Sequence, residues 1–283
     1  DVTIPSGVTL TILAGVEVLF QANSDDQSAG DRTSDSELRV GGGTLIAAGT
    51  AEAPVILASS DSEAKPGDWG GIRVYSRGNV TFSHVEMRDD GYGLSAGEYQ
   101  DLGNLDISNS HFHNTTAGIY AYYMAGDFSV RDTLFDITTD GWEVRINRGA
   151  TSIDFSNNTL LKVGQVYFYG PHGGAPVTVN NNDFGGGRLQ IQDTSGDIEV
   201  IGNVFEGITH DWALQVLNSG TSEKRNWTVS DNVLTNVVYG ARIHETSQNA
   251  DPALLFSNNV ITTTDGAGLQ LSGWTDAEIV NNT

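Results

Sequence analysis

The chain has 283 residues, with 36 acidic and 14 basic side chains, a formal net charge of −22 and no cysteine. The absence of cysteine excludes disulfides, thiolate metal sites and a cysteine nucleophile. The negative charge disfavours nucleic acids and anionic lipids as partners, because both carry charge of the same sign. No apolar run approaches the roughly 20 residues that a membrane-spanning helix needs, so we expect no membrane insertion.

Apolar residues occupy alternate positions through the first part of the chain, with interruptions at Pro5–Gly7 and Ala14–Gly15. Alternation broken by Pro and Gly predicts short β-strands joined by tight corners. Three later stretches are rich in Ser, Asp and Gly and lack this alternation, which is the composition of loops. We therefore expect polar excursions at residues 21–37, 58–68 and 217–226.

One phrase recurs along the chain, with two alternating apolar residues, then Asn or Asp, Asn, and a further apolar residue. Its clearest copy is Ile153–Leu160. The second apolar residue of each copy falls at Phe82, Ile107, Val130, Phe155, Val179, Val200, Val229, Phe256 and Ile279. The shortest interval, Val179 to Val200, is 21 residues and the longest, Val200 to Val229, is 29. Self-similarity at such a period predicts a solenoid, in which each coil buries its apolar face against its neighbours.

A second apolar pair stands ahead of each copy, as in Ile119/Ala121, Val144/Ile146 and Leu189/Ile191. Two strand signatures in every coil, with no helical periodicity anywhere, predict an all-β chain. Successive coils would stack as parallel strands about 4.8 Å apart.

Three N-terminal phrases carry a resemblance to a known family: Leu10–Val18, Gly43–Ile56 and Gly67–Ile72. With the repeats, they make the chain similar to the right-handed parallel β-helix, pectate-lyase-like superfamily, and in particular to β-helix modules of bacterial and archaeal secreted or cell-surface proteins. The resemblance implies one domain over residues 1–283, with about eleven coils and three parallel sheets. It also implies an extracellular or cell-surface location. It identifies a scaffold and no reaction, because one fold hosts many functions.

Six successive coils carry Asn at the same position, at Asn158, Asn182, Asn203, Asn232, Asn259 and Asn282. Stacked Asn side chains can hydrogen-bond from coil to coil, and Asn tolerates the left-handed corner that ends a strand. We expect a structural asparagine ladder here.

The outward positions of the first strand in each coil give the candidate ligand site. Aromatic and planar hydrogen-bonding side chains gather there on consecutive coils: Tyr120, Tyr122, Arg145, Asn147, Tyr167 and Tyr169, with His172 nearby. Aromatic faces beside a guanidinium suit sugar rings or uronates, which need stacking and bidentate polar contacts. Ordinary strand surface is the competing interpretation, because Tyr and Arg are favoured on exposed strands.

Catalysis is less well supported. Glycoside hydrolysis needs two carboxylates roughly 5–9.5 Å apart, and the outward columns contain none. The carboxylates at their margins lie on coils two apart from each other: Glu143, Asp193 and Glu245. A polysaccharide lyase acting on an acidic polysaccharide remains the alternative, with Tyr120 or Tyr167 as a base beside Arg145, or His244 beside Arg242. We assign no catalytic residue.

The first excursion contains four carboxylates that could hold calcium: Asp25, Asp26, Asp31 and Asp35. Ca²⁺ takes oxygen ligands, but the spacing matches neither an EF-hand nor the Gly-Gly-x-Gly-x-Asp repeat. A solvated acidic loop is the competing interpretation. Calcium is the only cofactor that the sequence suggests.

The sequence favours a non-catalytic extracellular module for adhesion or glycan binding. The first alternative is the polysaccharide lyase described above, and the second alternative is an architectural stalk or assembly subunit. Expected partners are a polysaccharide, a cell-surface glycan or neighbouring modules of the same polypeptide. Asp1 is not an initiator Met and the chain ends inside a repeat copy, so we expect a fragment of a longer protein.

Overall fold

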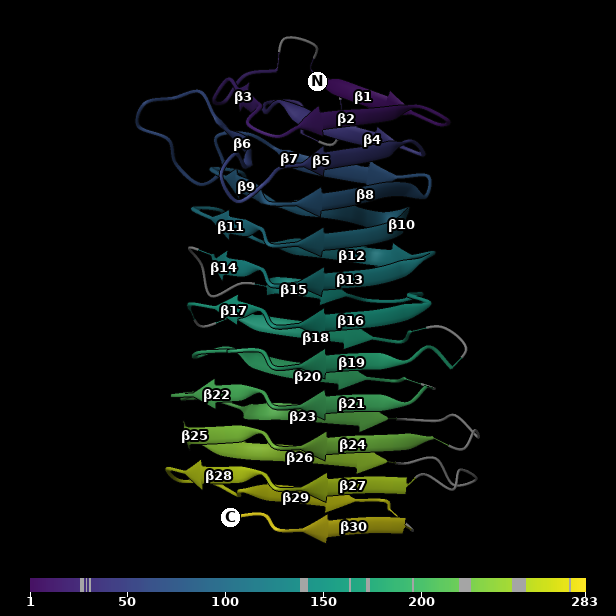
Figure 1. The fold of residues 1–283 in the computed structure, drawn as a ribbon, viewed down its shortest axis with the longest axis vertical. Helices are drawn as coiled ribbons and strands as arrows, with labels where there is room; N and C mark the ends of the chain where they lie inside the picture. Colours follow the sequence, from purple (N-terminus) through teal and green to yellow (C-terminus); the bar gives the residue numbers. More distant parts are fainter. Residues whose placement is uncertain are drawn as a thin grey trace.

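The computed structural model describes residues 1–25, 28, 30, 32–137, 142–162, 164–171, 174–194, 196–218, 225–245, 253–274 and 276–283. Its regular elements are β-strands, and every pairing between them is parallel. Figure 1 shows these strands stacked coil upon coil from the N-terminal to the C-terminal end. The predicted all-β parallel solenoid is confirmed. Within the described residues no helix is long and apolar enough to cross a membrane.

The strands lie on three faces. The first face holds β1 (Val2–Pro5), β4 (Glu37–Gly41), β7 (Gly71–Tyr75), the start of β10 (Leu94–Ser108), β12 (Ile119–Met124), β15 (Trp142–Ile146), β18 (Gln165–Tyr169), β20 (Arg188–Gln192), β23 (Trp212–Asn218), β26 (Tyr239–Glu245) and β29 (Leu269–Ser272). The second holds β2 (Thr9–Leu13), β5 (Thr44–Ala48), β8 (Gly78–Ser83), the end of β10, β13 (Asp127–Arg131), β16 (Ser152–Ser156), β19 (Val177–Asn180), β21 (Ile198–Ile201), β24 (Asn226–Ser230), β27 (Ala253–Ser257) and β30 (Asp276–Val280).

The third face has shorter strands: β3 (Glu17–Phe20), β6 (Val55–Ser59), β9 (Val85–Arg88), β11 (His111–His113), β14 (Leu134–Asp136), β17 (Thr159–Leu160), β22 (Val204–Glu206), β25 (Val233–Val237) and β28 (Val260–Thr263). Asp183 joins the two parts of this face, because it forms isolated bridges with Thr159 and Val204.

The core is a column of inward side chains contributed by every coil. Strand alternation places Val144, Val166 and Leu189 in register on neighbouring strands, and all three are fully buried. On the third face the rings of Phe184 and Phe205 stack with centroids 4.5 Å apart. Each such buried side chain contributes roughly 1.5–3 kcal/mol of transfer free energy, so the coils stabilise one another through this column.

The corner between the second and third faces is built by one residue in the left-handed conformation, for example Asn157 with φ of 56° and Asn258 with φ of 57°. Asn and Asp adopt this conformation more readily than other side chains, which explains their recurrence here. From Asn157 onward, the residue after this corner belongs to the asparagine ladder. Asn182 Nδ2 donates to Asn203 Oδ1 at 2.9 Å and to the Phe155 carbonyl of the preceding coil at 2.8 Å. The ladder is confirmed.

Two long connections leave the coils near the N-terminal end. One joins β3 to β4 and the other joins β6 to β7, where Trp69 stacks on Phe20 with centroids 4.0 Å apart and planes 3° apart. Figure 1 shows both connections at the N-terminal end. Of the expected excursion at 217–226, β23 includes residues 217 and 218, β24 begins at Asn226, and residues 219–224 lie outside the described part.

Candidate ligand-binding face

Three consecutive strands of the first face bring together the central residues of the predicted ligand site. Tyr120 of β12 pairs in register with Arg145 of β15, and Arg145 pairs with Tyr167 of β18. All three side chains are half-buried. Adjacent parallel strands are about 4.8 Å apart, so the three side chains form a continuous surface. We call Tyr120, Arg145 and Tyr167, with Asn147 and Tyr169, the Tyr–Arg platform.

The Arg145 guanidinium lies between the two flanking tyrosines. Its carbon is 5.9 Å from the Tyr120 ring centroid and 5.5 Å from that of Tyr167, both within the range of a cation–π contact. Arg145 Nε donates to Asn147 Oδ1 at 2.7 Å, and Asn147 is itself buried. These contacts fix the guanidinium, which gives the platform a positive centre in a strongly acidic protein.

Further aromatic groups extend the surface. Tyr169 stacks on Tyr167 with centroids 6.1 Å apart, and the Arg148 guanidinium lies 5.6 Å from the Tyr169 ring. Tyr122 meets Tyr123 edge to face, with centroids 4.9 Å apart. The alternation pattern did not identify Arg148 and Tyr123, because both follow the last clear alternation of their strands.

The Tyr167 phenol is a poor general base in this setting. Partial burial raises its pKa; the nearby Arg145 charge lowers the pKa by a smaller amount, and Tyr169 and Asp193 add to the rise. The phenol also donates from Oη to Gln192 Oε1 at 3.2 Å. Tyr167 therefore keeps its proton at neutral pH, which suits a binding surface better than proton abstraction.

The other candidates do not gather into a second site. His172 lies outside the described residues. Glu143 is buried, and Glu245 is buried beside Arg225, with Oε2 and Nη1 3.7 Å apart. His244 Nδ1 is hydrogen-bonded to Ser272 Oγ. Asp193 directly follows β20, and β18 lies between β20 and β15, so Asp193 and Glu143 come from strands that do not pair with each other.

The structure describes two of the four candidate calcium ligands. The Asp35 carboxylate is buried and pairs with Arg32 Nη1 at 2.9 Å, while the Asp25 carbonyl accepts a hydrogen bond from the Ser28 amide at 3.2 Å. Asp26 and Asp31 lie outside the described residues. In the described part of the chain, no three His, Asp or Glu side chains are grouped to hold a metal ion. Calcium in this loop stays a prediction.

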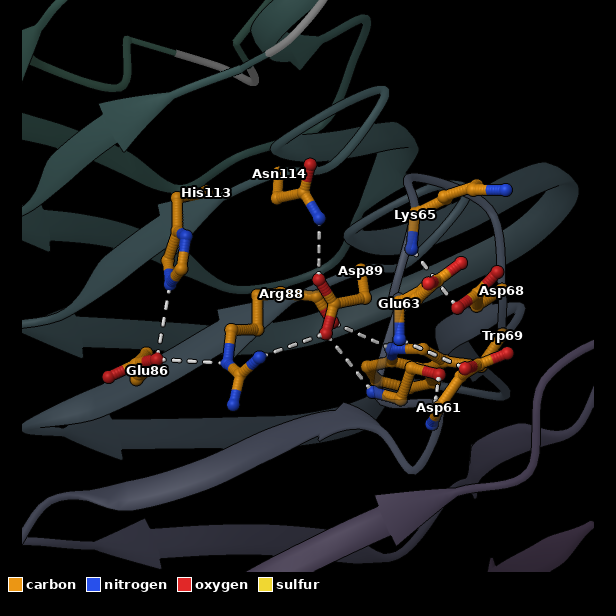
Figure 2. A network of polar contacts seen from close by, with 11 residues as sticks. Asp61, Glu63, Lys65, Asp68, Trp69, Glu86, Arg88, Asp89, His113 and Asn114 are labelled. Atoms are coloured by element: carbon orange, nitrogen blue, oxygen red, sulfur yellow. Dashed lines mark hydrogen bonds and ion pairs between the residues drawn. The ribbon is translucent and has the colours of Figure 1, made fainter.

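A polar network on the third face attaches the 60–70 connection to the coils. Figure 2 shows Asp89 at its centre, where its carboxylate accepts from Arg88 Nη1 at 3.2 Å and from Asn114 Nδ2 at 2.6 Å. Trp69 Nε1 donates to the Arg88 carbonyl at 2.8 Å. Glu86 pairs with Arg88 at 3.0 Å and accepts from the His113 ring at 3.1 Å. These hydrogen bonds join the 60–70 connection to neighbouring coils, so the role of the network is to hold the loop in place.

Together, the parallel coils, the three sheets and the aromatic outward face define a β-helix protein. The profile of the family described as right handed beta helix region matches residues 60–205, which is more than half of the chain, and the profile described as pectate-lyase like beta helix domain matches residues 1–99. The chain belongs to the right-handed β-helix family. No curated protein and no solved structure matches the chain.

Proposed function

We propose that the protein is a non-catalytic extracellular module that binds a glycan through the Tyr–Arg platform. The observation that carries the proposal is the Arg145 guanidinium, held between the rings of Tyr120 and Tyr167 on a rigid sheet. Aromatic faces pack against the apolar faces of sugar rings, and a fixed guanidinium donates to hydroxyl or carboxylate oxygens.

Rigidity supports binding because little side-chain entropy remains to be lost. The platform residues lie on or directly next to strands that pair on both sides, and Asn147 and Gln192 hold Arg145 and Tyr167 through hydrogen bonds. A preorganised surface converts more of its contact energy into affinity.

A polysaccharide lyase on the same face is less well supported. The raised pKa of Tyr167 works against its use as a base. The carboxylates of Glu143 and Glu245 are buried, so neither is exposed to a ligand on the platform. No specific contact among the described residues favours a stalk over a binding module.

The test is retention on a panel of immobilised neutral and acidic polysaccharides, with release of unsaturated uronate measured in the same samples. Arg145→Met and Tyr167→Ala should each reduce retention at least about tenfold, which corresponds to about 1.4 kcal/mol. Gln270→Ala is the matched control, because Gln270 is an exposed residue in the same outward column, several coils away.

If both platform variants are retained as well as wild type, or if wild type is retained on no glycan, the proposal is refuted. The architectural stalk is then the remaining alternative. Release of unsaturated uronate that is lost in Arg145→Met would establish the lyase. Thermal unfolding midpoints of all variants should stay close to wild type, because these side chains are half-buried on the outer surface.

A further inference from the structure

Glu143 is an extra residue inserted into strand β15. Trp142 pairs with Gln165 and Val144 pairs with Val166, so Glu143 has no opposite residue on β18. An insertion of this kind is a β-bulge, which re-aims a side chain and bends the strand. Here the side chain ends up inside the molecule, because Glu143 is only 1% exposed.

Two glycines make room for this bulge. A Cβ at Gly164 would lie 2.2 Å from the Glu143 carboxyl carbon and 2.4 Å and 2.6 Å from its oxygens. A Cβ at Gly118, on the other side, would lie 2.3 Å from the Glu143 carbonyl oxygen. Contacts this short do not occur in folded proteins. Gly164 therefore leaves the space that holds the carboxyl group, and Gly118 leaves the space that holds the Glu143 backbone carbonyl.

Within the part of the chain that the structure describes, the carboxyl group has no compensating partner. Neither oxygen is hydrogen-bonded to any described residue. Burial raises the pKa of Glu143 to about 8, and no charged group contributes to this shift. The titratable and charged side chains of the neighbouring strands reach the surface instead: Tyr120, Tyr122 and Tyr123 on β12, Arg145 on β15, Tyr167 and Tyr169 on β18, and Arg188 on β20.

We propose that Glu143 is a proton-operated latch beneath the Tyr–Arg platform. While the carboxyl group is neutral, it stays buried and the bulge in β15 is maintained. When its proton passes to water, the carboxylate leaves its pocket for solvent, because an unpaired charge is not stable in an apolar interior. Only Val144 separates Glu143 from Arg145, so the movement disturbs the strand that presents the guanidinium.

The direction of the disturbance follows from strand geometry. Removing the bulge requires a one-residue shift against β18 on one side of Glu143, and such a shift turns the shifted side chains to the opposite face. A shift of Val144–Ile146 would take Arg145 from its place between Tyr120 and Tyr167. The claim that the latch regulates glycan binding rests on the proposed function. The claim that β15 changes conformation when Glu143 loses its proton does not.

The experiment is amide hydrogen exchange of the β15 peptide at pH values from about 4.5 to above about 8, in wild type and in Glu143→Gln. The ratio of the wild-type rate to the variant rate cancels most of the intrinsic pH dependence of exchange. Between the ordinary Glu value of 4.5 and the folded-state pKa of about 8, the ratio should rise by up to about tenfold for each pH unit, because opening releases one proton, and above about 8 it should level off. Glu199→Gln, at an exposed position on β21, is the control and should follow wild type.

Wild-type and variant rates that stay parallel across this range would overturn the latch. If Glu143→Gln does not fold, Glu143→Leu gives the same comparison, since neither side chain ionises. Glycan retention measured well below pH 8 separates the two proposals. No retention together with a rising exchange ratio would refute the proposed function and leave the latch in place.

Discussion

Replacing Asn203 by Ala tests whether the asparagine ladder stabilises the solenoid. Asn203 is fully buried, and its Nδ2 donates to the Val179 carbonyl at 2.8 Å and to Asn232 Oδ1 at 3.0 Å. Its Oδ1 accepts from the Asn182 backbone amide and from Asn182 Nδ2, both at 2.9 Å. The substitution removes these four bonds and a longer one from Nδ2 to the Ile201 carbonyl at 3.3 Å, and it breaks the ladder in the middle of the stack.

The magnitude follows from the groups that lose their only partner. Asn232 Oδ1 keeps the backbone amide of residue 203 at 2.9 Å, and Asn182 Nδ2 keeps the Phe155 carbonyl. The Asn182 amide loses its acceptor, and the Val179 carbonyl loses its side-chain donor. Each unpaired buried group costs about 1–3 kcal/mol, and the small cavity adds to this. We expect a loss of about 3–5 kcal/mol.

The assay is chemical denaturation of wild type and Asn203→Ala, with hydrogen exchange to locate the effect. Because solenoid coils interact mainly with their neighbours, protection should fall most in β19, β21 and β24. Asn282→Ala is the matched control: Asn282 is half-buried in the last described coil, so water can replace its bonds and the loss should stay near about 1 kcal/mol. A loss below about 1 kcal/mol for Asn203→Ala would show that water or relaxation satisfies these groups and would refute the reasoning.

Three further predictions concern buried groups. Gly164→Ala should destabilise the protein by about 1–3 kcal/mol, because its Cβ would overlap the Glu143 carboxyl group, and Glu143→Ala should restore part of the loss in a denaturation double-mutant cycle. Asp90 has its pKa raised to about 6 by burial, from 3.8; the folded state therefore binds this proton more tightly, and stability should fall as pH rises from about 4 to about 6, by on the order of 3 kcal/mol. Asp90→Asn should flatten that slope in denaturation midpoints, and an unchanged slope would contradict the assignment. Arg225→Met should cost about 3–5 kcal/mol, because it removes a buried cation whose Nη1 lies 3.7 Å from Oε2 of the buried Glu245 carboxylate, and Arg225→Met with Glu245→Gln should recover part of the thermal midpoint.

The fold could be predicted because each coil repeats the same constraints. Inward positions such as Phe155 and Val179 must be apolar, and the corner at Asn157 must tolerate a positive φ. These demands recur at every coil, so they appear in the sequence as a period. The ladder and the pairing of Tyr120, Arg145 and Tyr167 follow from the same period, since parallel coils place equivalent residues side by side.

Exposure could not be predicted from alternation alone. Arg73 occupies an outward position of the first face, yet it is 9% exposed. Its Nε donates to Glu37 at 3.0 Å, and its guanidinium lies 4.6 Å from the Tyr92 ring, which also packs on Arg32 of the first connection. The burial of Arg73 thus depends on contacts between residues far apart in sequence, and no local pattern contains them.

The burial of Glu143 could not be predicted for a different reason. Period-two alternation in β15 places Glu143 on the same side as Arg145, two residues away, so the pattern alone turns both outward. The bulge cancels this relation, because one inserted residue sends Glu143 inward while Arg145 stays on the platform. The space that stabilises the bulge depends on Gly118 and Gly164, which belong to the neighbouring coils. The Glu143 carboxyl group is costly to bury, and any loss of the bulge would expose it. The register of β15 is therefore sensitive to the protonation of Glu143. That register sets the position of Arg145.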